Sequence, residues 1–200
     1  MNLYCATTNP GKLREFRLII AHYGRGAFDL EPIEDTKSIP PCDETGATFE
    51  ENASQKALHY GAHAAGLLFA DDSGLEVDAL RGAPGIYSAR YAGAHAGDAA
   101  NNRLLIENLR GQPNRAARFV CAIALAADGK LVRTFRGHVD GKIIDDPRGA
   151  NGFGYDPLFF HEPFRCTFGE ASAEQKLLVS HRAKALAAML DFLSSQTAAK

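Results

Sequence analysis

Residues 2–23 read NLYCATTNPGKLREFRLIIAHY, and they join a strand signal to a helix signal across a short turn. Asn2–Ala6 is a short apolar run of strand-compatible residues, and Thr7–Gly11 has the composition of a turn. From Lys12 onward, apolar residues recur at helical spacing until Gly24 ends the pattern. The sequence therefore predicts a strand, a loop and a helix at the start of the chain.

Strand-like and helix-like segments are interspersed along the rest of the chain. Further strands are expected at residues 28–33, 118–126, 130–139 and 157–160, helices at 49–65 and 98–109, and a loop at 36–46. Asp128-Gly129 is a strong hairpin signal between two of these strands. The mixture predicts an α/β fold with a mixed sheet. No repeat or linker divides residues 1–200, so we expect a single domain.

Two helix starts can be predicted from local sequence. Thr48 and Glu51 match a capping box, in which Thr48 caps the backbone N–H of Glu51 and the Glu51 side chain reaches back. At the C-terminus, one unbroken helix would point Lys176, His181 and Arg182 at about 0°, 140° and 240°, on different faces. A break near Ser180 would instead place His181 and Arg182 in the first turn of a new helix.

Composition excludes several classes of protein. With 46% hydrophobic and 23% charged residues, the 200-residue chain has an ordinary globular composition, and no apolar run approaches the roughly 18 residues of a membrane helix. The net charge of −2 argues against a partner that is a nucleic acid polymer. The four cysteines form no C-x-x-C pair, so a zinc site is not expected. The N-terminus lacks export features, which predicts a cytoplasmic protein.

The first candidate site is the turn Thr7–Lys12. A strand that ends in such a turn and opens a helix presents free backbone N–H groups and a positive dipole end to an anion. Lysine is unfavourable in a first helical turn, and a bound anion would offset this cost. An ordinary connection with a surface lysine is the alternative, because the stretch is neither a P-loop nor a Rossmann fingerprint.

The second candidate site is acidic. Asp71 and Asp72 follow the apolar run 67–70, at the expected end of a strand, where side chains of α/β proteins face a cleft. Adjacent carboxylates repel unless a cation or hydrogen bonds stabilise them. Asp43 or Glu44 could complete a site for Mg²⁺, which takes one or two carboxylates and fills its other positions with water and phosphate oxygens. The alternative is a solvated acidic turn.

Two further segments suggest binding of a flat ring. In residues 149–156, GANGFGYD, glycines flank Phe153 and Tyr155, so the backbone can approach a ligand while a ring stacks on it. Arg182 could donate to the O6 and N7 acceptors of a 6-oxopurine and discriminate against adenine. The alternatives are a tight turn whose aromatic rings enter the core, and a helix start with exposed polar residues.

Five stretches together resemble the inosine/xanthosine triphosphate pyrophosphatases, a family of house-cleaning nucleoside triphosphate pyrophosphatases. They are ATTNPGKLREF at 6–16, DETGATFEENASQKA at 43–57, ADDSGLEVDALRGAPGIYSARYAG at 70–93, GANGFGYDPLFF at 149–160 and KLLVSHRAKAL at 176–186. They occur in family order and span nearly the whole chain. The stretch at 70–93 and the GFGYDP and SHR motifs are long and specific, which makes chance agreement implausible.

The resemblance implies an elongated mixed sheet with flanking helices and two lobes around a central nucleotide cleft, in a homodimer. It implies Mg²⁺-dependent hydrolysis of ITP, dITP or XTP to the monophosphate and pyrophosphate. Asp72 would be the catalytic base and a metal ligand, with Asp43 or Glu44 as a second ligand. The implied substrate-binding residues are Thr7, Thr8, Asn9, Pro10, Gly11, Lys12, Ser73, Phe153, Gly154, Tyr155, Asp156, Lys176, His181 and Arg182.

Two positions depart from the family pattern, and two other functions stay open. Asp43 stands where glutamate is common, so either Asp43 or Glu44 could approach the metal, and Pro10 stiffens a loop that usually lacks proline. A regulator that binds a nucleotide without cleaving it is one alternative function. A phosphatase that releases orthophosphate is another, although the D-x-D-x-T signature of aspartyl-phosphate enzymes is absent. Pyrimidine triphosphates are a weaker alternative substrate.

Overall fold

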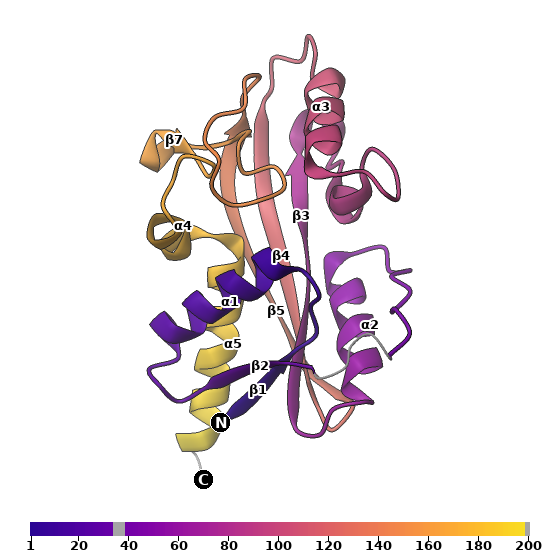
Figure 1. Cartoon of the computed structure of the whole chain (residues 1–200), viewed down its shortest axis with the longest axis vertical. Helices are drawn as coiled ribbons and strands as arrows, with labels where there is room; N and C mark the ends of the chain where they lie inside the picture. Colours follow the sequence, from indigo (N-terminus) through magenta and orange to yellow (C-terminus); the bar gives the residue numbers. More distant parts are fainter. Residues whose placement is uncertain (34–38, 199–200) are drawn as a thin grey trace. The chain divides into compact units, whose positions relative to one another are not determined.

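The computed structural model describes residues 1–33 and 39–198 (Figure 1). Its strands are β1 (Asn2–Cys5), β2 (Asp29–Pro32), β3 (Leu67–Val77), β4 (Ala116–Ala127), β5 (Lys130–Ile143), β6 (Phe159–His161) and β7 (Cys166–Thr167). Its α-helices are α1 (Pro10–Tyr23), α2 (Phe49–Gly61), α3 (Asp98–Asn108), α4 (Ala173–Val179) and α5 (His181–Ala198). Short 3-10 helices are η1 (Asp78–Leu80), η2 (Gly85–Arg90) and η3 (Glu162–Phe164).

The strands form one mixed sheet in the order β2-β1-β3-β4-β5-β6-β7. β1 pairs in parallel with β2 and β3, while β6 pairs antiparallel with β5 and β7. Parallel neighbours need crossover connections, and α1 and α2 supply them. The predicted α/β fold with a mixed sheet is confirmed.

Burial along β4 and β5 follows from their places in the sheet. β4 is almost continuously apolar and buried from residue 119 to 126, as expected for a strand covered on both faces. Exposed and buried residues alternate along β5 from residue 134 to 140, which is typical of a strand with one covered face. Asp128 and Gly129 join them with φ of 48° and 73°, and type I′ hairpin turns need positive φ at both central residues.

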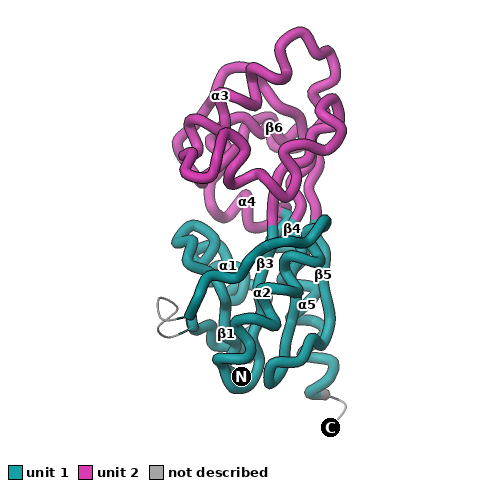
Figure 2. The backbone as a smooth tube through the Cα atoms, turned by 90° about the vertical axis from the view of Figure 1, so that its right-hand side faces the viewer, with its two compact units in different colours: residues 1–72, 121–137, 181–200 teal, residues 73–120, 138–180 magenta. Residues whose placement is uncertain are grey.

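The backbone divides into two compact units (Figure 2). Unit 1 comprises residues 1–72, 121–137 and 181–200, and unit 2 comprises residues 73–120 and 138–180. The chain passes between the units inside β3, β4 and β5 and between α4 and α5. The single pyrophosphatase domain and the cleft between two lobes stay predictions.

Each unit has its own apolar core. In unit 1, α1 packs along α5, and both lie on the other side of β3 from α2 in Figure 1. The rings of Phe16 on α1 and Phe69 on β3 meet edge to face, with centroids 5.2 Å apart. In unit 2, Leu105 of α3 and Leu109, which follows the helix, are fully buried in a cluster that includes Phe159 and Phe168. The helix that carries Lys12 is therefore fixed to the sheet.

The structure corrects several predicted boundaries. β3 does not end at residue 70 but continues through the acidic stretch to Val77, and α2 ends at Gly61 rather than at residue 65. The break before the last helix is confirmed, because Ser180 is extended with φ −65° and ψ 154°. Residues 39–46 are irregular, as expected, and residues 36–38 of the predicted loop lie outside the described residues.

Candidate active site

Asp71 and Asp72 lie in the middle of β3, so their placement in a solvated turn or at a strand end was wrong. They are only 2% and 6% exposed. β1 runs parallel beside β3, and the backbone N–H of Ala6 donates to the carbonyl of Phe69 at 2.9 Å. The turn that follows β1 therefore begins next to the two carboxylates. Buried carboxylates need cations or donors nearby, and three helices of unit 1 supply them.

The first cation is Lys12 of α1, whose Nζ lies 2.8 Å from Asp71 Oδ2. Pro10 begins the helix, Asn9 Oδ1 accepts the Lys12 backbone N–H at 3.0 Å, and Thr7 Oγ1 accepts the Asn9 N–H at 3.2 Å. The unfavourable lysine of the first turn thus has an internal counter-charge. Burial favours a higher pKa for Asp71, but Lys12, with help from other cations, lowers the pKa to about 2.

The second cation is Lys56 of α2, which contacts two carboxylates at once. Its Nζ lies 3.4 Å from both Glu44 Oε2 and Asp72 Oδ1. On the same face of the helix, Asn52 Nδ2 donates to Asp72 Oδ2 at 3.2 Å. Burial is the largest influence on Asp72 and raises its pKa, and the nearby lysines only partly oppose that rise. Neighbouring carboxylates with pKa values shifted in opposite directions are typical of acid–base sites.

Neither Lys56 nor Asn52 was among the predicted site residues. Both fall within the family stretch at 43–57, and their spacing of four residues on a helix that begins after Thr48 was the available signal. Their side chains cross from α2 to β3, and such a contact depends on how the helix packs on the sheet. The periodicity of α2 alone cannot show it.

The start of α2 holds the segment that carries Glu44. Thr48 caps Glu51 as predicted, at 3.1 Å, but the Glu51 carboxylate accepts the N–H of Ala47 at 2.6 Å, not that of Thr48. Asn52 Oδ1 accepts the N–H of Gly46 at 2.8 Å, so the residue that binds Asp72 also binds this segment. A Cβ at position 46 would stand 2.6 Å from Glu51 Cβ, which explains the glycine.

The third cation is Arg182 in the first turn of α5. It is 5% exposed, and its Nη1 lies 2.8 Å from Glu15 Oε2 on α1. Its charge is among those that lower the pKa of Asp71, behind that of Lys12. His181 is also buried, so the alternative of two exposed polar residues at a helix start was wrong. Unit 1 therefore brings Lys12, Lys56 and Arg182 together around Asp71.

In unit 2, the residues of the glycine loop (residues 149–156) hold one another in place. Asp156 is buried, and its Oδ2 accepts the Phe153 N–H at 2.9 Å and contacts Lys176 Nζ at 2.5 Å. Lys176 Nζ also lies 5.3 Å from the centre of the Phe153 ring. The Tyr155 ring enters the core and its hydroxyl donates to the Ser88 carbonyl at 2.8 Å. The half-buried Phe153 ring is thus the loop's available stacking surface.

The remaining predicted site residues are exposed or half-buried. Thr8, Asn9, Pro10 and Asp43 are exposed, whereas Thr7, Gly11, Glu44, Ser73 and Gly154 are half-buried. Because Glu44 and not Asp43 shares a lysine with Asp72, the geometry favours Glu44 as the carboxylate that accompanies Asp72. The loop residues and Lys176 belong to unit 2, with Ser73, and the others belong to unit 1.

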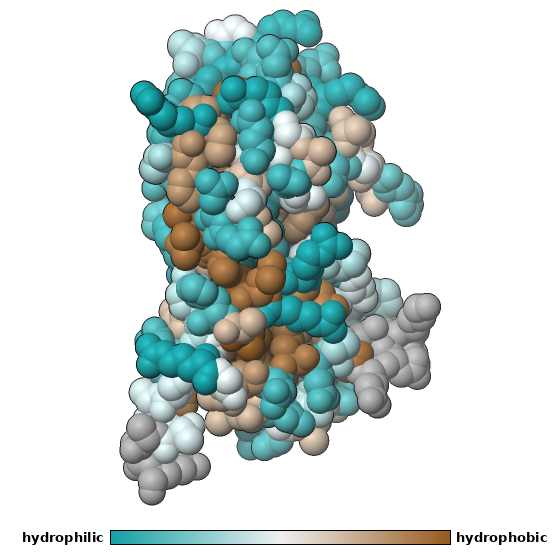
Figure 3. Space-filling view, turned by 60° about the vertical axis from the view of Figure 1, so that its left-hand side comes forward, coloured by the Kyte–Doolittle hydropathy of each residue, from teal (hydrophilic) through white to brown (hydrophobic). Residues whose placement is uncertain are grey.

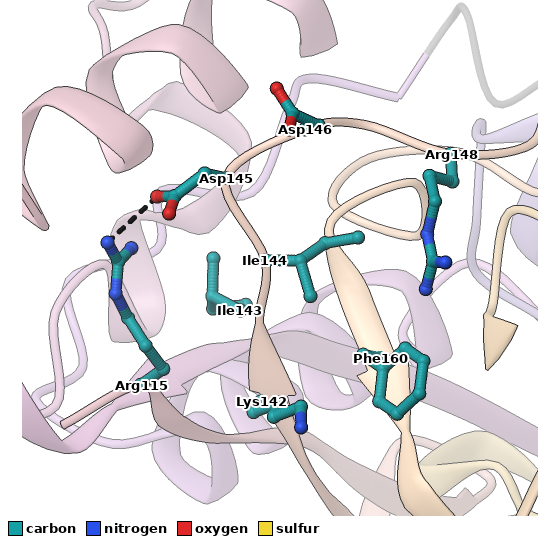
Figure 4. Close-up of a pocket in the computed structure, with 8 residues that line it drawn as sticks. All are labelled: Arg115, Lys142, Ile143, Ile144, Asp145, Asp146, Arg148 and Phe160. Atoms are coloured by element: carbon teal, nitrogen blue, oxygen red, sulfur yellow. Dashed lines mark ion pairs between the residues drawn. The ribbon is translucent and has the colours of Figure 1, made fainter. Parts of the chain in front are cut away.

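A hollow of about 600 Å³ in unit 2 is a different feature (Figure 4). Its lining includes three cations that already have carboxylate partners. Arg115 Nη2 lies 2.8 Å from Asp145 Oδ1, Lys142 pairs with Glu162, and Arg148 Nε lies 3.6 Å from a Glu170 oxygen. None of the predicted site residues lines it, so we do not assign the substrate to this hollow.

The donor set around Asp72 fits a small hard cation. Glu44 and Asp72 direct carboxylate oxygens at one ammonium group, so their charges converge on a single point. Within residues 1–33 and 39–198, no three His, Cys, Asp or Glu side chains form a cluster that could hold a metal ion. Two carboxylates nevertheless suit Mg²⁺, which is commonly held by one or two carboxylates, water and substrate phosphates.

The face drawn in Figure 3 has many hydrophilic residues and also a group of adjoining hydrophobic residues. Several large apolar side chains are exposed in the described part of the chain, including Tyr87 and Leu178, as is common on folded proteins. Over that same part of the chain, no helix combines the length and apolar character needed to cross a bilayer.

Comparison with known proteins identifies the family. Residues 3–192 match the Ham1 family. A protein of Exiguobacterium sp. strain AT1b, named dITP/XTP pyrophosphatase, is 50% identical over 186 residues, which are 93% of each chain. The Ham1 protein of Staphylococcus aureus superposes with a TM-score of 0.86 and 38% identity over 98% of this chain and 100% of that one.

A HAM1 protein from Coxiella burnetii gives a TM-score of 0.85 at 36% identity, covering 98% of this chain and 99% of that one. The agreement extends over nearly the whole chain in both sequence and structure, and it confirms the resemblance found from the motifs. The chain belongs to the Ham1 family.

Proposed function

We propose that this protein hydrolyses the non-standard purine nucleoside triphosphates ITP, dITP and XTP to the nucleoside monophosphate and pyrophosphate. Its task would be to remove deaminated purines from the nucleotide pool. The observation that carries the proposal is the cluster of Lys12, Lys56, Asp71 and Asp72 beside the N-terminus of α1. Membership of a family whose relatives are named dITP/XTP pyrophosphatases supports it.

The triphosphate would be bound at the start of α1. Thr7 to Gly11 precede or begin the helix, where backbone N–H groups and the helix dipole favour an anion. Lys12 lies in the same turn, and its ammonium group would exchange Asp71 for a phosphate oxygen when the triphosphate binds. A triphosphate carries about four negative charges, and transfer of a phosphoryl group is accelerated mainly by cations that stabilise the charge that develops.

Asp72 and Glu44 would hold the metal ion, for which we propose Mg²⁺. When bound, such an ion neutralises phosphate charge and polarises the phosphoryl group. Lys56 lies between the same two carboxylates, so it keeps them close together and limits their mutual repulsion before the ion arrives. Asn52 orients Asp72 from the other side, through its second oxygen.

Asp72 would also accept the proton of the attacking water. Water oxygen forms the new bond to the α-phosphorus, the bond from that phosphorus to the bridging oxygen breaks, and pyrophosphate leaves. The proton of the water moves to a carboxylate oxygen of Asp72. Its pKa, raised mainly by burial, makes Asp72 a better base than an exposed aspartate, whereas Asp71 stays charged beside Lys12.

Recognition of the base and its neighbours is assigned to Phe153–Asp156, Lys176, His181 and Arg182, and Ser73 would also contact the substrate. Phe153 offers a ring for stacking, while Asp156 serves mainly to hold Phe153 and Lys176. Arg182 would donate to the O6 and N7 acceptors of a 6-oxopurine. By the same family resemblance, we propose a homodimer that acts on free nucleotides, and we keep the proposal of a cytoplasmic location.

The deciding experiment is a product assay. Purified protein incubated with ITP and Mg²⁺ is expected to release pyrophosphate and IMP in equal amounts, with dITP and XTP also cleaved and ATP cleaved slowly. Binding of ITP with no pyrophosphate released would indicate a nucleotide-binding regulator. Release of orthophosphate would indicate a phosphatase, and faster cleavage of pyrimidine triphosphates would overturn the assigned substrate.

Arg182→Lys is expected to reduce the preference for ITP over ATP, measured as the ratio of kcat/KM values, by about tenfold or more. Lysine keeps a positive charge for Glu15, but it lacks the planar fork that binds two acceptors. Arg182→Ala should reduce the ratio as well. The exposed Arg17→Lys on α1 is the matched control and should keep the normal ratio. An unchanged ratio in both Arg182 variants would contradict the recognition role.

A further inference from the structure

Three glycines of the glycine loop have backbone angles that glycine adopts more easily than other residues. Gly149, Gly152 and Gly154 all have positive φ, at 80°, 74° and 64°. Glycine reaches this region without strain but loses more conformational freedom on folding than any other residue. A Cβ at position 154 would meet nothing within 4 Å, so the glycine is there for its backbone angle and not for close packing.

One helix binds both backbone polar groups of Gly154. The Gly154 N–H donates to Asp98 Oδ2 at 2.7 Å, and its carbonyl accepts from Asn102 Nδ2 at 3.1 Å. Asp98 and Asn102 are four residues apart and therefore lie on one face of α3. The bond to Asp98 has an ionised acceptor, which makes it the stronger of the two.

The helix that provides these two side chains is itself firmly placed. Asn101 is buried, accepts the Ala92 N–H at 2.8 Å and donates to the Ala89 carbonyl at 3.2 Å. Leu105 is fully buried in the core of unit 2. Contacts of α3 with the core and with residues 89–92 thus fix its position without help from the glycine loop.

The Asn102 side chain uses only part of its capacity for hydrogen bonds in this contact. Its Oδ1 is buried and accepts no hydrogen bond from the described residues, while its amide N–H binds Gly154. A buried acceptor without a partner is unfavourable for stability, and such groups in native proteins call for an explanation. A role in placing Gly154 provides one.

Gly154 directly follows Phe153, so contacts that hold the Gly154 backbone restrict where the Phe153 ring can lie. Asp156 binds the N–H on one side of Phe153, and α3 binds the residue on the other side. We propose that Asp98 and Asn102 are positioning residues for base recognition, which fix the Phe153 ring for stacking against the purine. The inference rests on the proposed function and adds a specific task for α3.

The test separates binding of the base from binding of phosphate. In Asn102→Ala, the affinity for IMP should fall about tenfold, because stacking on an aromatic ring contributes on that scale. The affinity for pyrophosphate should change less than twofold, because Lys12 and the start of α1 are untouched. Calorimetry measures both constants, and amide hydrogen exchange at residues 152–156 should be faster in the variant.

Matched variants distinguish positioning from a general loss of structure. Asp98→Asn keeps an acceptor for the Gly154 N–H and should bind IMP more tightly than Asp98→Ala. Asn108→Ala is the control, because Asn108 is on the same helix and donates to the Tyr91 hydroxyl at 2.8 Å, away from the loop. It should bind IMP normally.

Three results would overturn the inference: normal IMP affinity in Asn102→Ala, equal losses for IMP and pyrophosphate, or unchanged exchange in the loop. Failure of the proposed function is a separate outcome. It would appear as no pyrophosphate released from ITP by the unaltered protein, whereas IMP binding and loop exchange still report on the positioning role.

Discussion

Asp72→Asn is expected to lower kcat for ITP hydrolysis about a thousandfold, since a positioned general base contributes on the order of 10² to 10⁴ and the same carboxylate is assigned to the metal. Asparagine has nearly the same size and can still accept a hydrogen bond from Asn52. It removes a buried charge that burial already disfavours. The variant should therefore fold normally, and pyrophosphate release is the measurement.

The control for this variant is Asp146→Asn, which changes the same chemical group at an exposed position in unit 2. It should keep full activity. Circular dichroism and thermal unfolding would verify that both variants are folded. Turnover within tenfold of normal in Asp72→Asn would remove Asp72 from the chemistry, whatever its role in the fold.

Asp71 is expected to make the free energy of unfolding fall as the pH is lowered into the acid range. Its pKa is about 2 in the folded protein, against 3.8 for an ordinary aspartate. Because the pKa is lowered by folding, the charged Asp71 carboxylate stabilises the folded protein fully above about pH 4. This stabilisation is lost as the pH falls through about 2. A lowering of the Asp71 pKa on this scale corresponds to roughly 2 to 3 kcal/mol of unfolding free energy. Urea unfolding between pH 6 and pH 2 measures it.

Asp71→Asn should remove this part of the pH dependence and should also destabilise the protein at pH 6, because Lys12 loses its buried partner. Asp145→Asn, which breaks the exposed pair with Arg115, should leave the acid dependence almost unchanged. The same slope in Asp71→Asn as in the unaltered protein would mean that other groups govern acid unfolding.

The sequence predicted correctly those parts of the fold that depend on residues close together in the chain. The strand, turn and helix at 2–23, the hairpin at Asp128-Gly129 and the break at Ser180 all depend on neighbouring residues. The Ser180 break could even be argued from geometry, since three polar residues could not share one face of a continuous helix.

Contacts between distant segments were harder to predict. The carboxylates at 71 and 72 suggested the end of a strand because they follow the apolar run 67–70. The structure compensates them with residues from α1, α2 and α5, and no local pattern reveals that assembly. Lys56, Asn52 and the contact between α3 and Gly154 were missed for the same reason.

The internal partner of Lys12 has a consequence for which anions the protein can retain. An ammonium group that already touches a buried carboxylate offers little net attraction to a singly or doubly charged visitor. Orthophosphate, which has no base for the protein to bind, would gain little by entering. A polyphosphate that brings its own divalent cation can compete with Asp71 for the Lys12 ammonium group. The Lys12–Asp71 ion pair would therefore favour binding of polyphosphates over binding of anions with fewer charges.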